Sequence, residues 1–458
     1  MSILDHCLMP PRPVQVEVLT QVEKTWDDTD VYLIIAPVAS GKSLIADTIA
    51  KWSNKGTSII TPDNLLVQQY TSTFNLHTIR PKHTYKGAGY NIAKYKSRGA
   101  SCVFNYITYM ANRAYNHCLI IDEAHNMVDH LRGTAKLWKH LYGIPENMYT
   151  VDDLMEWLEL PHKLPVAKQE KLAKFREALL ANPDRYIIET AVETYRNQPR
   201  EVLKLVDVIP RDNPPIYWPP GRVKKLVLMS ATISKEDVYD LGLDDRRVTV
   251  IDVDSPIPAE NRPIIYRPID SMSYHNVPAA APKVMDWVVK MQKLRKGQRG
   301  LIHTTYSMVR HLKKALKDRH GDCPNIMFHT KWDKQEKLEQ WLNSDLNDSK
   351  VLVGCGMTTG LSLDHDKARW SAIVNLPFAN LKDRAVRANL ERRPANYAWQ
   401  TIRHVLQASG RTTRTPTDWS DCFILDSRFP KLYKEHSGMW PEWFRHGLEE
   451  GGGLERDT

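Results

Sequence analysis

The sequence predicts an α/β protein with two parallel-sheet domains in tandem and a helical insertion in the first domain. Short apolar runs alternate with amphipathic runs between residues 30 and 125, and the alternation returns from about residue 262. Such alternation is typical of βαβ units. A chain of 458 residues also has room for about three folding units. We expect domain 1 in residues 1–126 and 206–258, the insertion in 127–205 and domain 2 in 259–458.

The first half begins with an apolar strand, VYLIIA, which leads into a glycine-containing loop and a helix that starts near Ser43. Later strands and helices are expected in TSIIT (57–61), LLVQQYTSTF (65–74) and HCLIID (117–122). After the interruption, the strand pattern resumes in RVKKLVLMSATIS (222–234) and VTVIDV (248–253). Together these segments predict βαβ units that build a parallel sheet.

The interruption has a different pattern. Thr150 and Asp153 form a capping-box start for TVDDLMEWLEL, and Leu172, Phe175 and Leu179 recur at helical spacing in KQEKLAKFREALL. The pattern therefore predicts a helical insertion.

The second half follows a polar linker with three prolines, DVDSPIPAENRPI (252–264). Its alternating elements are expected in RGLIHTTY (299–306), HLKKALK (311–317), NIMFHT (325–330), KLEQWL (337–342), KVLVGCG (350–356), WSAIVNLPF (370–378), AWQTIRHVL (398–406) and DCFILD (421–426). This series predicts a second parallel sheet.

The composition limits the class of protein. Lys and Arg number 63 against 54 Asp and Glu, a net charge of +9, which suits a polyanionic partner such as nucleic acid but also occurs in ordinary soluble proteins. The six cysteines include no C-x-x-C pair, and no run of about 18 apolar residues occurs. We expect a reduced, cytoplasmic protein without a membrane segment.

The segment APVASGKS (36–43) matches the phosphate-binding pattern G-x-x-x-x-G-K-[ST], except that Ala36 replaces the first glycine. Lys42 is expected to reach the β- and γ-phosphates of ATP, and the Ser43 hydroxyl to bind Mg²⁺. A plain strand-turn-helix with a surface lysine is the alternative. The expected nucleotide-binding residues of the loop are Pro37, Val38, Ala39, Ser40, Gly41, Lys42 and Ser43.

Two adjacent carboxylates end the strand HCLIID in the sequence DEAH (122–125). Asp122 is expected to complete the Mg²⁺ site with Ser43, because NTPases place an acid at the end of a neighbouring strand. Glu123 is expected to polarise the water that attacks the γ-phosphate. Alone, the pair could equally cap the next turn.

Several segments resemble the motifs of superfamily 2 helicases, which implies two RecA-like domains sharing one ATP. These are DEAH, SAT (230–232) and QASGRTTR (407–414). More narrowly, a further set resembles the XPD/DinG family: FNYITYM, MSATIS, TTGLSLDHD, VNLPFAN and QASGRTTRTPTDWSDCFILDSRF. The likeness extends from about residue 10 to residue 430.

The resemblance implies roles for residues of both halves. Arg411 and Arg414 would stabilise the charge on the γ-phosphate from domain 2, and Gln407 would contact nucleotide or water; a surface arginine pair is the alternative. Gln15 would read adenine, and Gly360 and Asp364 would couple nucleotide to the translocated strand. Contacts with the nucleic-acid strand would come from five residues: Thr61, Tyr106, Thr304, Thr305 and Tyr306.

Two features depart from the XPD/DinG pattern. Of the four cysteines that usually hold an iron–sulfur cluster, only Cys102 remains, so no cluster is expected. The stretch before Cys102 is basic and aromatic, and its Lys86 and Tyr90 are further candidates for single-strand contacts, with a solvated basic face as the alternative. The insertion also looks short, as in compact bacteriophage helicases. If the protein is encoded by a phage, its expected location is the cytoplasm of the host.

The combined interpretation is an ATP- and Mg²⁺-dependent DNA helicase or translocase. It would act as a monomer on single-stranded or tailed duplex DNA, with 5′ to 3′ travel implied by the resemblance. The alternatives are an RNA-dependent ATPase, a double-strand branch-migration translocase, and a nucleic-acid binding module whose NTPase activity has decayed. The retention of Lys42, Asp122, Glu123, Arg411 and Arg414 together argues against decay.

Overall fold

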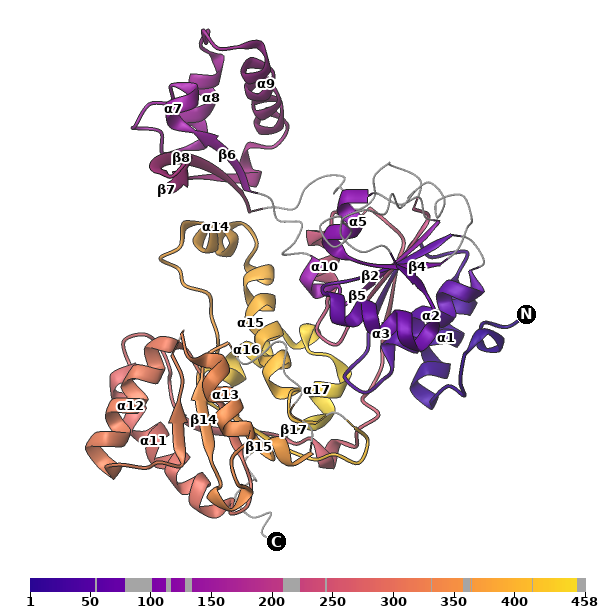
Figure 1. Cartoon of the computed structure of the whole chain (residues 1–458), viewed down its shortest axis with the longest axis vertical. Coiled ribbons are helices and arrows are strands. Elements are labelled where there is room, and N and C mark those ends of the chain that lie inside the picture. The colour runs from indigo at the N-terminus through magenta and orange to yellow at the C-terminus, as the bar shows by residue number, and fades with distance from the viewer. Residues whose placement is uncertain are drawn as a thin grey trace.

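A computed structural model gives the structure of the chain (Figure 1). The residues it describes are 1–53, 56–78, 101–112, 117–127, 134–208, 223–243, 245–330, 332–356, 363, 365–413 and 415–450. Within these residues, no helix has both the length and the apolar character needed to cross a membrane.

Domain 1 contains a seven-stranded sheet in the order β10-β1-β9-β5-β2-β4-β3, and all its neighbouring strands are parallel. Its strands are β1 (Val31–Ile35), β2 (Thr57–Thr61), β3 (His77–Thr78), β4 (Cys102–Asn105), β5 (Cys118–Asp122), β9 (Lys225–Ser230) and β10 (Val248–Asp252). Parallel strands bring their carboxyl ends to one edge, so segments that follow different strands meet there.

Helices cover both faces of this sheet. Tyr32 and Ile34 of β1 pack into one core cluster and Leu33 packs into another, because successive side chains of a strand point to opposite faces. The helical elements are η1 (Ile3–His6), α1 (Pro13–Thr25), α2 (Lys42–Trp52) and α3 (Asn64–Phe74), which pack in the first cluster, and α5 (Tyr106–Asn112) and α10 (Lys235–Asp240), which pack in the second. The apolar strands expected from the sequence are therefore buried on both sides.

The insertion combines helices with a three-stranded antiparallel sheet of order β6-β8-β7. The expected capping box is present, since Thr150 accepts from the Asp153 backbone and Asp153 accepts from the Thr150 backbone. The strands were not expected. The elements are β6 (Thr134–Trp138), α7 (Lys139–Tyr142), α8 (Val151–Glu159), α9 (Val166–Ala181), η3 (Pro183–Arg185), β7 (Tyr186–Tyr195) and β8 (Gln198–Asp207).

Domain 2 contains a second seven-stranded sheet, of order β13-β14-β12-β15-β16-β11-β17, again with all neighbours parallel. Its strands are β11 (Ile264–Asp270), β12 (Gly300–His303), β13 (Ile326–Phe328), β14 (Val351–Gly354), β15 (Trp370–Ile373), β16 (Asp421–Asp426) and β17 (Leu448–Glu450). The two parallel sheets confirm the predicted fold class.

The helices of domain 2 also divide between the two faces. The longer ones, α11 (Val277–Leu294) and α12 (Tyr306–His320), share a core on one face, and α15 (Pro394–Ser409), α16 (Phe429–Glu435) and α17 (Glu442–Gly447) share a core on the other. The remaining elements are η5 (Ala259–Asn261), α13 (Lys334–Leu342), η6 (Leu346–Asp348), η7 (His365–Lys367), α14 (Arg384–Arg392) and η8 (Ser437–Met439). Figure 1 shows α15 and α17 on the side of domain 2 that faces domain 1.

Candidate nucleotide site

The strand order of domain 1 places the glycine-containing loop beside the acidic pair. Strand β9 lies between β1 and β5, so Ile35, Ser230 and Asp122 end three adjacent strands. The backbone N–H of Ala36 donates to the Ser230 carbonyl at 3.0 Å, and that of Ala124 donates to the Met229 carbonyl at 3.0 Å. The loop after β1 and the DEAH segment after β5 are thus held at one edge, on either side of SAT.

Backbone conformation in the loop depends on two residues with positive φ. Ala39 has φ +68°, and Gly41, which caps the N-terminus of α2, has φ +76°. A Cβ atom on Gly41 would lie 2.1 Å from Nε2 of Gln15, so glycine is required here by space as well as by conformation. The side chain of Ala36 is fully buried in the core, which explains how alanine serves in place of the first glycine.

Gln15 and Arg12 hold the loop from outside. The Gln15 amide Nε2 donates to the carbonyls of Ser40 at 3.0 Å and Gly41 at 3.3 Å, and its Oε1 accepts from the Arg12 N–H at 2.8 Å. Arg12 Nη1 donates to the Ala39 carbonyl at 2.7 Å. Gln15 is 3% exposed and braces the loop, and its expected contact with adenine stays a prediction.

Lys42 lies between the loop and the acidic pair. Its Nζ donates to the Ala36 carbonyl at 3.2 Å and lies 3.9 Å from Glu123 Oε1. Glu123 has φ +52°, a left-handed conformation that is strained for a residue with a side chain. Strain of this kind is commonly found at functional sites, and here it orients the carboxylate toward the lysine.

Asp122 is held by hydrogen bonds on both carboxylate oxygens. Oδ2 accepts from the Tyr70 hydroxyl at 2.9 Å, and Oδ1 accepts from the Glu123 N–H at 3.0 Å. Burial, reinforced by the neighbouring negative charge of Glu123, raises the pKa of Asp122 to about 6, whereas Lys42 acts in the opposite direction. A buried carboxylate with a raised pKa is stabilised in its charged form by a nearby cation.

The oxygen donors at this edge fit Mg²⁺. The Asp122 carboxylate accepts from the Tyr70 hydroxyl, and the Ser43 side chain affects the pKa of the same tyrosine, so both expected ligands lie near Tyr70. Mg²⁺ prefers oxygen ligands and is typically bound by one or two carboxylates together with substrate phosphates. The side chains present therefore suit the ion.

His125 connects DEAH to SAT. Its Nδ1 lies 2.7 Å from Ser230 Oγ and 3.4 Å from Glu123 Oε2. The Ser230 hydroxyl also accepts from the Thr232 N–H at 3.1 Å. A change in the position of the Glu123 carboxylate can therefore be transmitted to the segment after β9.

Helix α15 of domain 2 contacts this segment directly. Arg403 Nη1 donates to the His125 carbonyl at 3.0 Å, and its Nη2 lies 3.6 Å from Asp237 of α10. Trp399 Nε1 donates to the other Asp237 carboxylate oxygen at 2.8 Å. At the N-terminal end of α15, Arg393, which caps the helix, and Asn396 donate to the Asp240 carboxylate. Buried charges thus join the two domains beside the acidic pair.

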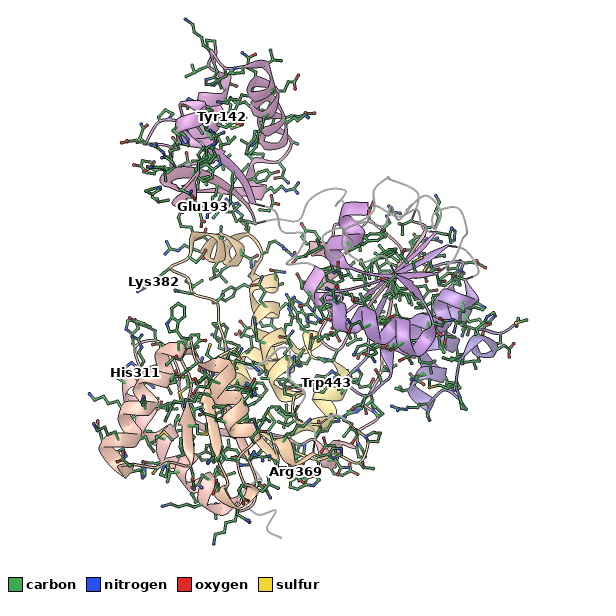
Figure 2. The ribbon with its side chains drawn as sticks, in the orientation of Figure 1. Tyr142, Glu193, His311, Arg369, Lys382 and Trp443 are labelled. Atoms are coloured by element: carbon green, nitrogen blue, oxygen red, sulfur yellow. The ribbon has the colours of Figure 1, made fainter. Side chains whose placement is uncertain are left out.

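Trp443 of α17, labelled in Figure 2, provides a second contact between the domains. Its Nε1 donates to the Ala231 carbonyl of SAT at 3.4 Å, and its ring lies beside Gly410 of the QASGRTTR segment. The side chain is 5% exposed. Trp443 therefore packs between the segment that follows β9 and the segment that carries the arginines.

The arginine segment begins on α15. Gln407 lies one helical turn after Arg403 and is 9% exposed. Arg411 follows the end of the helix, and its charge adds to the effect of burial in lowering the pKa of His303 to about 3. The structure thus brings Arg403 to the DEAH segment and places Arg411 near the carboxyl end of β12. Arg414 lies outside the described residues.

Two residues of domain 1 that are expected to contact nucleic acid, Tyr106 and Thr61, are buried and bonded to protein atoms in this structure. Tyr106 is 2% exposed, and its hydroxyl donates to the carbonyls of Asp122 at 2.7 Å and Glu123 at 2.9 Å. Thr61 is fully buried and donates to the Asp63 carbonyl at 2.9 Å. Both side chains are enclosed by protein atoms, and their contacts with nucleic acid stay a prediction.

The three candidates in domain 2 differ in accessibility. Thr304 is 9% exposed and donates to Asn375, and the Thr305 hydroxyl caps α12 by accepting from the Met308 N–H. Only Tyr306 of the three is exposed, at 38%. Four other candidates lie outside the described residues: Lys86, Tyr90, Gly360 and Asp364.

Comparison with known proteins agrees with this geometry. Residues 288–447 match a family model described as a helicase C-terminal domain, and residues 8–149 match one described as the res subunit of type III restriction enzymes. The helicase subunit XPD/RAD3 of general transcription and DNA repair factor IIH from Saccharomyces cerevisiae is 26% identical over 102 residues, which are 20% of this chain and 13% of that protein. The chain is therefore similar to a helicase C-terminal domain in its second half and, over a short segment, to an XPD/RAD3 helicase subunit.

Solved structures of XPD-like proteins share the fold over nearly the whole chain. The structure of Xpd4 from S. tokodaii matches with a TM-score of 0.59 and 14% identity, covering 96% of this chain and 100% of that one. A structure titled XPD helicase matches with a TM-score of 0.60 and 13% identity, covering 96% and 99% of the two chains. This chain therefore shares the tandem RecA-like fold of those structures.

Three residues of the site had no signal in the sequence: Tyr70, Arg403 and Trp443. Tyr70 lies within an apolar helix, where a tyrosine is most simply a core residue. Arg403 lies four residues before Gln407, and that spacing, which places both on one helix face, is the only pattern that could have indicated it.

Proposed function

We propose that this chain is an ATP-dependent helicase or translocase that moves along single-stranded DNA from 5′ to 3′. The observation that supports it best is the meeting of Lys42, Asp122 and Glu123 at one sheet edge, with Arg403 of domain 2 bonded to the carbonyl of His125 in the same segment. ATP hydrolysis at such a place can alter the fit between the two domains, which is what a stepping motor requires.

Each group has a defined task in this proposal. Lys42 neutralises the β- and γ-phosphates, and Glu123 orients the attacking water and accepts its proton. Ser43 and Asp122 would hold Mg²⁺, which would neutralise part of the phosphate charge. Arg411 and Arg414 would stabilise the charge of the transition state from domain 2, as arginine fingers do in other NTPases.

ATP turnover with and without single-stranded DNA tests the motor. We expect stimulation by single-stranded DNA in the wild type and its loss in Lys42→Ala. Low turnover that is equal in both proteins would favour a binding module with a decayed NTPase. Stronger stimulation by single-stranded RNA than by DNA would favour an RNA-dependent ATPase, and stimulation by duplex DNA alone would favour a double-strand translocase.

Duplexes with a tail on one side test the direction of travel. We expect opening of 5′-tailed substrates, because the resemblance to XPD/DinG helicases implies movement from 5′ to 3′. Opening of 3′-tailed substrates alone would overturn the direction while leaving the motor in place.

A further inference from the structure

Tyr70 lies where two expected Mg²⁺ ligands approach each other. Its hydroxyl donates to Asp122 Oδ2 at 2.9 Å. Burial raises the pKa of Tyr70, and the Ser43 side chain lies near enough to the same hydroxyl to act, more weakly, in the opposite direction. The tyrosine comes from α3, Ser43 from α2 and Asp122 from β5. One side chain therefore joins three separate elements at the carboxyl edge of the sheet.

The packing around Tyr70 allows it little freedom. The side chain is fully buried, its ring packs against Phe74 at 5.8 Å between centroids, and both belong to the core cluster that includes Leu44 and Ile45 of α2. A hydroxyl on a fixed ring has a fixed position. It can therefore set the orientation of the carboxylate that it binds.

The two oxygens of Asp122 are held from opposite sides. Tyr70 binds Oδ2, and the Glu123 N–H binds Oδ1 at 3.0 Å. Each oxygen accepts one hydrogen bond and keeps further acceptor capacity, because an ionised carboxylate has about four lone-pair sites. The rotation of the carboxylate is thus fixed while the group remains able to bind a cation or one of its waters.

We propose that Tyr70 is a positioning residue that aligns Asp122 and Ser43 for Mg²⁺ bound with ATP. This inference rests on the proposed function, since it assumes that the site binds a metal–nucleotide complex. Partners that orient metal ligands contribute about 10–100-fold in metal affinity or activity in other metal sites. Tyr70 touches neither nucleotide nor reacting atoms in this account and acts only through the two ligands.

The test is the variant Tyr70→Phe, which removes the hydroxyl and keeps the ring. Mg²⁺ is titrated by calorimetry into the full chain saturated with a non-hydrolysable ATP analogue, and Mn²⁺ is titrated in parallel with detection by electron paramagnetic resonance. We expect metal affinity to fall by about 10-fold or more in the variant. Binding of the analogue without metal should stay within about twofold of wild type, because the proposal assigns Tyr70 no contact with the nucleotide.

Tyr32→Phe is the matched control. Tyr32 is also fully buried in domain 1, and its hydroxyl donates to the Val22 carbonyl at 3.1 Å, on α1 and away from the metal ligands. Both variants lose one buried hydroxyl, so a general loss of stability would affect them alike. We expect Tyr32→Phe to bind both metals as wild type does.

The outcomes separate this inference from the proposed function. If wild type binds the metal–nucleotide complex and Tyr70→Phe binds it equally well, Tyr70 has only a packing role and the inference is wrong. Equal losses in the Tyr70→Phe and Tyr32→Phe variants would also overturn it. If wild type itself binds no metal with the analogue, the proposed ATP site is wrong, and the inference fails with it.

Discussion

At the residue scale, two alanines stand at glycine-type positions of the nucleotide loop in different environments. Ala36 is fully buried, whereas Ala39 has φ +68°. A left-handed conformation costs a residue with a side chain about 1–2 kcal/mol. Alanine is therefore well suited to the first position and strained at the second.

Glycine substitutions should distinguish these two positions. Ala36→Gly should lower the free energy of unfolding by about 1–2 kcal/mol, because a buried methyl is lost and the unfolded chain gains freedom. Ala39→Gly should leave the free energy of unfolding unchanged within about 0.5 kcal/mol or raise it slightly. Glycine removes the strain of the positive φ, and this offsets the added conformational freedom of the unfolded chain. Urea unfolding followed by tryptophan fluorescence measures both. Equal destabilisation by the two substitutions would contradict the strain at Ala39.

Glu123→Gln should separate binding from hydrolysis. The amide keeps the shape of the side chain but cannot accept a proton from water, so ATP turnover should fall by about 10²–10⁴-fold. Affinity for ATP should not decrease, because removing a negative charge beside the phosphates lowers repulsion. Turnover by phosphate release and binding by a fluorescent nucleotide are the measurements. Turnover within a factor of about three of wild type would exclude Glu123 as the base.

Sequence patterns indicate residues of the site when those residues lie together in the chain. The loop at 36–43 and DEAH at 122–125 are such cases. Tyr70 is 52 residues from Asp122, and its hydrogen bond depends on how α3 packs against the sheet. Gln15, Thr61 and Tyr106 occur where the resemblance implies, but burial gives each a bond to protein atoms that the sequence alone does not show.

At the element scale, α10 and α15 form the polar contact between the domains. Asp237 of α10 is fully buried and binds both Trp399 and Arg403 of α15. Burial raises the pKa of Asp237 to about 6, although Arg403 acts to lower it. The attraction of the arginine therefore does not fully compensate for the loss of water around the carboxylate.

This raised pKa gives the stability of the chain a definite pH dependence. The folded-state pKa lies above the ordinary value of 3.8, so the folded form binds the proton more tightly than the unfolded form. The contribution of Asp237 to stability is thus fully present below about pH 4 and is lost as pH rises through about 6. Asp237→Asn cannot titrate and should lack this loss.

Unfolding of wild type and Asp237→Asn at several pH values tests this expectation. The unfolding free energy of the variant minus that of wild type should increase by about 2–3 kcal/mol between pH 4 and pH 7, because each pKa unit corresponds to about 1.4 kcal/mol. Asp252→Asn is the comparison variant. Burial also raises the pKa of Asp252 to about 6, but its carboxylate accepts from the Glu442 N–H of α17 rather than from α15. A pH-independent difference for Asp237→Asn would contradict the raised pKa.

The strands of the insertion show where sequence patterns are weak. Strand β7 begins with three buried residues, Tyr186 to Ile188, and from Glu189 onward alternates half-exposed and exposed residues, as an antiparallel strand with one face toward solvent should. The turn to β8 uses Arg196 and Asn197, both with positive φ, in place of the Asn-Gly or Asp-Gly pair that usually indicates a hairpin. Because this hairpin lacks a glycine, the alternation of β7 does not by itself identify a strand from the sequence.

At the scale of the whole molecule, the two sheets could be predicted because most of their strands, such as β1, β5 and β14, carry their own apolar pattern, whereas the short edge strands β3 and β17 do not. The relation between the domains could not, because it depends on a few buried contacts between distant residues, such as Arg403 with His125 and Trp443 with Ala231. Figure 1 shows the insertion apart from the domain 1 sheet and next to α14 of domain 2. The insertion is thus continuous with domain 1 in sequence but docks on domain 2.

The contact between the insertion and α14 is partly apolar and partly polar. Ile187 and Val208 pack against Ala388, and Arg392 donates to the carbonyls of Asp184 and Tyr186. Both ends of the insertion lie together, because Thr134 of β6 pairs with Val206 of β8. A short linker can therefore replace residues 134–206 without stretching the strands of domain 1.

Deletion of the insertion should separate ATP hydrolysis from duplex opening. The residues proposed to bind ATP all lie outside it, so turnover stimulated by single-stranded DNA should remain within about threefold of wild type. If the insertion separates the strands at the junction, the rate of opening of a tailed duplex should fall by about 10-fold or more. A 10-fold loss corresponds to about 1.4 kcal/mol, the contribution of one well-placed contact. A variant with Arg392→Ala, which keeps the insertion but loses its bonds to Asp184 and Tyr186, should show a smaller loss of opening. Full opening activity without the insertion would show that the strands are separated elsewhere on the two RecA-like domains.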